Sequence, residues 1–126
     1  MERTHGHPFF DNTETVYTGS SDDDALNAGV ARLAATRDAL NELERWYWPT
    51  GNLEIPVLTL HNQRDPLVPL LHEELFSEIV ADAGRSDLLV QRVVDSFGHC
   101  VFSAAEQVQA LNDLAEWAET GVKPVP

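Results

Sequence analysis

The chain has 126 residues, 43% of them hydrophobic, and carries a formal net charge of −13 because 21 Asp and Glu outnumber 8 Lys and Arg. This length is that of one domain. Excess negative charge repels nucleic acid and anionic lipid, so we expect neither as a partner. No apolar run approaches the roughly 18 residues of a membrane helix. The first residues lack the apolar core of a secretory signal, so we expect no export by that route and take the cytoplasm as the default location.

The first 52 residues are predicted to be loop followed by helical segments. Glycine, proline and asparagine are scattered through residues 1–20, a mixture typical of loop. Ser21 and the three aspartates after it have the pattern of a helix N-cap with an acidic first turn, which we favour over an acidic binding site. Apolar residues at helical spacing then predict one helix over residues 22–35 and another over residues 37–47.

Two features of this region have more than one interpretation. His5 and His7 are of a residue type that binds metals, but their turn-rich surroundings favour a solvated loop. The aromatic cluster Trp46 to Trp48 precedes a turn marked by proline and glycine. We interpret this cluster as packing against the edge of a core, with a pocket lining as the alternative.

Two strands are predicted further along the chain. A short apolar run at residues 55–60 predicts a buried parallel strand, which the polar cluster HNQR bounds and Asp65 follows. A second strand is predicted over residues 88–94, and the loop after it carries His99. Because a helical segment lies between the strands, we expect parallel strands joined by a right-handed crossover. The expected fold class is α/β, a small parallel sheet flanked by helices.

Two helices are expected to cover this sheet, each through one apolar face. The crossover helix, about residues 70–83, should stop at Gly84 and bury Leu71, Leu75, Ile79 and Val80. The last helix begins at a capping box, Ser103 to Glu106, and extends to about residue 119. Its expected buried residues are Val108, Leu111, Ala115 and Ala118.

Asp65 and His99 each follow a predicted strand by a few residues. Parallel strands end at the same edge of a sheet, where the functional groups of α/β proteins collect, so we expect the two side chains to meet. Each residue alone also fits a structural interpretation. Asp65 suits a turn residue that binds nearby backbone N–H groups, and His99 suits a core histidine bonded to a carbonyl.

The runs LHNQRDPLVP and LLVQRVVDSFGHCVF, with the closing helix, resemble the carboxy-terminal part of a serine α/β-hydrolase over about residues 53–120. In that superfamily the acid lies in a strand-end run that closes on Val-Pro, as Asp65 does here, with His61 near the usual glycine. The catalytic histidine lies in a Gly-His pair, which Gly98-His99 matches. The resemblance implies that Asp65 orients the imidazole and that His99 is the general base and acid of a triad. Residues 1–126 would then form a single partial domain of this kind.

The resemblance also requires a nucleophilic serine in G-x-S-x-G before the acid. No serine of the chain lies in that setting, and no HGGG-like oxyanion stretch is present: the serines are Ser20, Ser21, Ser77, Ser86, Ser96 and Ser103. Cys100 is interpreted as a poor substitute, because adjacent residues on one loop rarely align sulfur and imidazole. We therefore expect a segment that supplies Asp65 and His99 for ester or amide hydrolysis and is inactive as an isolated chain. Nucleophile and oxyanion hole would be encoded elsewhere.

A function of another class stays open, namely a non-catalytic protein-interaction module that retains the hydrolase scaffold. A small sheet leaves an apolar edge unpaired, so we expect self-association or a partner chain at that edge. The completed enzyme would act on a small-molecule or peptide ester or amide. We expect no cofactor. A metal site through His61, Asp65 and His99 is a distant alternative, because nothing fixes a ligand geometry.

Overall fold

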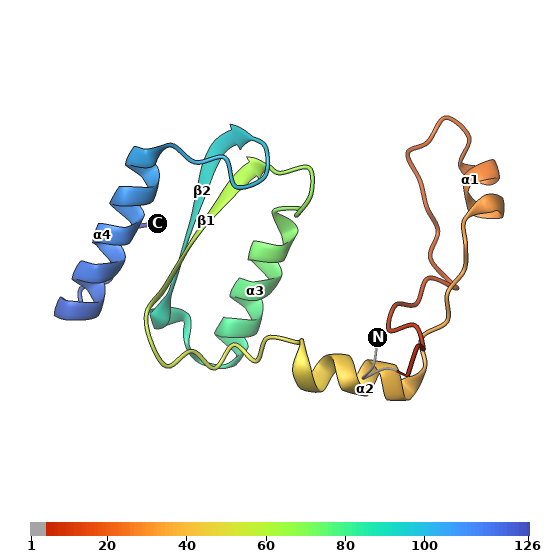
Figure 1. Ribbon diagram of the computed structural model, residues 1–126, viewed down its shortest axis with the longest axis horizontal. Coiled ribbons are helices and arrows are strands. Elements are labelled where there is room, and N and C mark those ends of the chain that lie inside the picture. Colours follow the sequence, from red (N-terminus) through yellow and green to blue (C-terminus); the bar gives the residue numbers. More distant parts are fainter. Residues whose placement is uncertain (1–4) are drawn as a thin grey trace. The chain divides into compact units, whose positions relative to one another are not determined.

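The computed structural model describes residues 5–126 (Figure 1). Met1 to Thr4, on which part of the expectation about export rests, lie outside the described residues. The chain forms two compact units, residues 1–48 and 49–126, which are described separately. Within the described part of the chain, no helix is both long and apolar enough to cross a membrane.

The first unit contains two helices, α1 (Asp23–Gly29) and α2 (Arg37–Trp46). The prediction for α2 is confirmed, whereas the prediction of a helix over residues 22–35 is wrong at its end. The chain leaves the helix at Val30, which is extended. The buried Asn12 side chain then binds the Ala31 carbonyl at 3.0 Å and the Leu33 N–H at 2.7 Å. These tertiary hydrogen bonds satisfy backbone groups that a longer helix would have paired internally.

Two details of this unit correct the sequence interpretation. The N-cap of α1 is Asp22, whose carboxylate accepts the Ala25 N–H at 2.9 Å, so Ser21 is not the cap. The aromatic cluster is not packed into a core edge, since Trp46, Tyr47 and Trp48 are 53%, 65% and 58% exposed. Arg45 covers one face of the Trp46 ring.

The second unit is an α/β sandwich built around a two-stranded parallel sheet, which confirms the predicted fold class. Its elements are β1 (Val57–Arg64), α3 (Leu71–Asp82), a 3₁₀ turn (Ser86–Leu88), β2 (Leu89–Phe97) and α4 (Ala104–Thr120). Helices α3 and α4 lie on opposite faces of the sheet (Figure 1). Thr59 of β1 bonds Glu73 of α3, and Arg92 of β2 pairs with Asp113 of α4. The core between these layers contains Val80, Leu89, Val90, Ala110 and Trp117.

Both strands are longer than predicted. β1 continues through the polar cluster to Arg64 instead of ending near residue 60, and β2 continues to Phe97 instead of residue 94. The register pairs Asn62 with Val94 and Arg64 with Phe97, so β2 carries one extra residue in a bulge. Polar residues remain in the strand because ladder hydrogen bonds satisfy the backbone whatever the side chain is.

The ends of the helices were predicted more accurately than their buried faces. Gly84 takes a left-handed φ of 69° after α3, and the capping box of Ser103 and Glu106 is present at α4. The predicted buried face of α4 is wrong, because Ala110 and Trp117 contact the core instead. The predicted set is exposed: Val108 and Leu111 at 56% and 67%, together with Ala115 and Ala118. On α3, Val80 is buried as expected, but Leu71 and Leu75 are exposed.

Candidate active site

Asp65 follows the last residue of β1 and is held by its own turn. Its Oδ1 accepts the backbone N–H groups of Leu67 and Val68 at 2.8 and 3.0 Å. Its Oδ2 faces Nδ1 of His99 at 2.8 Å. The side chain is 3% exposed, so this carboxylate is buried with three hydrogen bonds. The structural interpretation of Asp65 as a turn residue therefore holds together with its contact to His99.

Asp65 is ionised over the ordinary pH range. Burial of the carboxyl raises its pKa, but the Val68 N–H, the His99 ring and the Leu67 N–H outweigh burial. Together they lower the pKa of Asp65 to about 2. A carboxylate can only accept a hydrogen bond, so Nδ1 of His99 carries the proton. In the neutral ring, Nε2 then presents its lone pair away from Asp65.

His99 lies in the loop after β2 and is 43% exposed at its side chain. The loop starts at Gly98, whose N–H donates to the Arg64 carbonyl at 3.2 Å. Gly98 has a φ of 128°, and a Cβ added there would lie 2.6 Å from Cγ2 of Val101. Both the backbone angle and this contact require glycine at the position before His99.

Cys100 departs from the sequence interpretation. It takes a left-handed φ of 54°, and its exposed Sγ lies 3.7 Å from Nε2 of His99. The sulfur of Cys100 therefore faces the imidazole of His99, although the two residues are neighbours on one loop. The thiol lies beside Nε2, the ring nitrogen of His99 that does not contact Asp65.

Two polar residues of β1 support the pair from opposite faces of the strand. Asn62 is fully buried and bonds both backbone groups of Val101, in the His99 loop. His61 faces α3, and its Nε2 lies 3.0 Å from the Val68 carbonyl, in the Asp65 turn. Its Nδ1 lies 3.8 Å from Glu73, which also accepts hydrogen bonds from Thr59 and Gln91.

Sequence reasoning missed these roles for Asn62 and Glu73, and considered His61 only as a motif position and a metal ligand. The sequence signal for these roles is the presence of polar residues in the strand-like run that became β1. His61 is turned to Val68 and Glu73 and does not join Asp65 and His99 in a ligand set. Among residues 5–126, no three His, Cys, Asp or Glu side chains are grouped so as to hold a metal ion.

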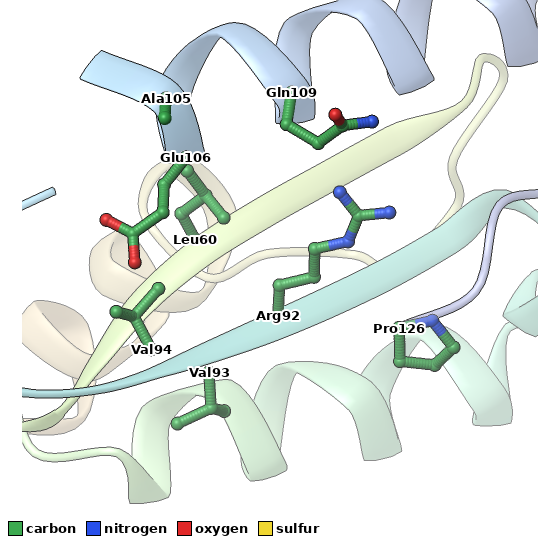
Figure 2. A pocket seen from close by; sticks show the side chains of 8 residues that line it. All are labelled: Leu60, Arg92, Val93, Val94, Ala105, Glu106, Gln109 and Pro126. Atoms are coloured by element: carbon green, nitrogen blue, oxygen red, sulfur yellow. The ribbon is translucent and has the colours of Figure 1, made fainter. Parts of the chain in front are cut away.

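A hollow in this unit lies away from the pair, along the outer edge of β2 beside α4 (Figure 2). It has a volume of about 460 Å³ and is lined by Leu60, Arg92, Val93, Val94, Ala105, Glu106, Gln109 and Pro126. Figure 2 shows Arg92 and Val93 leaving opposite faces of β2, so the hollow surrounds the edge of the strand. Asp65 and His99 do not line it.

Comparison with known proteins places the chain near an amide hydrolase. It is 32% identical over 110 residues to an o-phthalyl amidase of Xanthobacter agilis. The similarity covers 82% of this chain but 23% of the amidase, so the chain spans about a quarter of that protein's length. No protein-family profile matches the chain, and no solved structure matches it. The chain therefore has distant similarity to a hydrolase segment.

Proposed function

We propose that the chain is the carboxy-terminal segment of a serine α/β-hydrolase and supplies the acid and the histidine of its triad. The observation that carries this proposal is the 2.8 Å hydrogen bond between Asp65 and His99 at the carboxyl ends of two parallel strands. The similarity to an amidase favours amide hydrolysis over ester hydrolysis. The sequence provides no serine in a nucleophile elbow, so the proposal places the nucleophile and the oxyanion hole in another segment.

In this function, His99 moves protons and Asp65 keeps its charge. As a serine Oγ attacks the carbonyl carbon, Nε2 of His99 takes the hydroxyl proton. The imidazolium then gives that proton to the leaving amine as the C–N bond breaks. Water releases the acyl group with His99 again acting as base. Asp65 stabilises the imidazolium without taking its proton, which a carboxyl pKa of about 2 supports.

A chimera tests this proposal. The segment of the X. agilis amidase that matches this chain is replaced by residues 1–126, and o-phthalyl amide hydrolysis is measured. We expect an active chimera in which His99→Ala lowers kcat/KM on the order of 10³-fold or more. His72→Ala, an exposed histidine on α3, is the matched control and should retain activity.

A fluorophosphonate probe applied to the isolated chain gives a second readout, since we expect no serine adduct by mass spectrometry. An adduct that disappears in His99→Ala would show a nucleophile inside this chain. A chimera that hydrolyses the amide equally well without His99 would refute the assigned role.

The proposed partner surface is the outer edge of β1 together with the exposed apolar stripe of α4, which contains Val108 and Leu111. The other edge, that of β2, already meets the chain's own tail, because Arg92 donates to the Val125 carbonyl at 2.9 Å and prolines flank that residue. Asp113 of α4 faces the same side through its 2.7 Å pair with Arg92. At 100° per residue, Leu111 points the opposite way round the helix. This asymmetry supports docking of further chain at β1.

The alternative function, a non-catalytic interaction module on the same scaffold, is supported by the exposed aromatic cluster of Trp46 to Trp48. It predicts that His99→Ala leaves partner binding unchanged and that no chimera is active. The chimera therefore separates the two functions.

A further inference from the structure

Asn62 is a fully buried polar side chain that lies against the loop carrying His99 and bonds to it. It lies in β1, three residues before Asp65, on the face of the strand opposite His61. Its amide group has two donors and one acceptor oxygen. Burial of such a group costs free energy unless each is paired, so the partners of Asn62 show what the residue is for.

Most of these bonds go to one residue of the His99 loop. Nδ2 of Asn62 donates to the Val101 carbonyl at 2.9 Å, and Oδ1 accepts the Val101 N–H at 3.0 Å. The second Nδ2 proton goes to Oγ of Ser96, in β2. The side-chain amide thus pairs with Val101 as a neighbouring strand would, although the loop is not part of the sheet.

This pairing fixes the short loop on the far side of His99. On the near side, the Gly98 N–H is bonded to the Arg64 carbonyl at 3.2 Å. His99 and Cys100 lie between these two attachment points, and the His99 side chain is 43% exposed. The orientation of the ring therefore depends on its hydrogen bond to Asp65 and on where the backbone ends of the loop are fixed.

We propose that Asn62 is the positioning residue for His99, holding the loop so that Nδ1 meets Asp65 and Nε2 faces outward. This inference rests on the proposed function for its catalytic meaning, but the hydrogen bond it concerns can be measured without activity. Only an amide satisfies Val101 completely. A carboxylate at position 62 would lose both donors and bury a charge, and an apolar side chain would lose all three bonds.

The test is proton and nitrogen NMR of the histidine rings in the full chain. In wild type, the His99 Nδ1 proton should give a slowly exchanging downfield signal that Asp65→Asn removes. We expect Asn62→Ala to lose this signal while the amides of β1 and β2 stay native. Ser96→Ala keeps the bonds to Val101 and should keep the signal. Asn12→Ala, a comparably buried asparagine of the first unit, should also keep it.

A persistent Nδ1 signal in folded Asn62→Ala overturns the inference. If that variant does not fold, Asn62→Thr replaces it, because threonine suits a strand and its hydroxyl does not reach Val101. Loss of the sheet in both variants would show a role in folding and also overturn the inference.

In the chimera, a positioning residue should affect the chemical step and not substrate binding. We expect Asn62→Ala to lower kcat on the order of 10²-fold with little change in KM. Failure of the proposed function appears as a dispensable His99, whereas failure of this inference appears as an unchanged Nδ1 signal.

Discussion

At the residue scale, Asp65 makes the stability of the second unit depend on pH in the acid range. Its pKa of about 2 lies below the usual value of 3.8, so the folded state favours the ionised carboxyl. This contribution is complete above pH 3.8 and disappears as the pH falls through about 2. We expect the stability difference between wild type and Asp65→Asn to be constant near neutrality and to shrink over that acid range.

Urea unfolding of the second unit at a series of pH values measures this difference in the free energy of unfolding. Glu116→Gln serves as a control, because Glu116 is an exposed carboxyl of α4, away from Asp65 in the sequence. A gap between wild type and Asp65→Asn that stays constant down to pH 2 would contradict the assignment of the low pKa to the folded state.

The sequence was sufficient to pair Asp65 with His99 but not to find Asn62. A strand-end acid and a Gly-His dipeptide are local patterns, and parallel strands bring them to one edge. Asn62 stands beside Gln63, an exposed residue of similar chemistry in the same polar cluster. What distinguishes Asn62 is Val101, which is 39 residues away and is adjacent only in the folded unit. Patterns within a short window do not contain that information.

At the element scale, the start of α4 follows directly from the loop that carries His99. Ser103 accepts the Glu106 N–H at 3.2 Å, and Glu106 in turn accepts the Ser103 N–H at 2.7 Å. We expect Ser103→Ala to destabilise the second unit by about 1 kcal/mol, because it leaves an N-terminal donor of the helix unpaired. Equilibrium urea unfolding measures this change.

Ser77→Ala is the matched control for that substitution, since Ser77 is exposed within α3 and caps no helix. Equal losses for the two variants would show that the capping box contributes nothing at this position.

Element ends and element faces were not equally predictable. A capping box and a glycine stop depend on residues within a few positions of each other, so both were read from the sequence. The face of α4 depends on what the sheet offers it. Ala110 is small enough for close approach to the sheet, and Trp117 fills the space further along the helix. Val108 and Leu111 are also apolar and at helical spacing, but they stay exposed. Periodicity identifies an apolar stripe but not which of two stripes meets the core.

At the scale of the whole molecule, the exposed stripe of α4 predicts association. Leu111 is 67% exposed and Val108 56%, and within the described part of the chain β1 pairs with β2 alone. We expect the purified chain to sediment as a species larger than a monomer, and Leu111→Lys to shift it toward the monomer. Sedimentation velocity over a dilution series measures both.

Gln109→Lys is the control for charge, because it adds the same cation on the β2 side of α4, where Gln109 lines the hollow of Figure 2. Since the chain carries a net charge of −13, a general effect of added positive charge would appear in both variants. A wild-type chain that remains a single monomeric species at every concentration would contradict the proposed docking edge.

The two halves of the site are anchored over very different lengths of chain. Asp65 binds amides two and three residues further on, whereas His99 reaches Asp65 across 34 residues. The Asp65 turn can therefore form early in folding and during synthesis, but His99 is aligned only after β1, the crossover helix and β2 have closed into one unit. An unfinished chain holds a prepared carboxylate and an unaligned imidazole. Alignment of the imidazole with the carboxylate would thus come late in the folding of this unit.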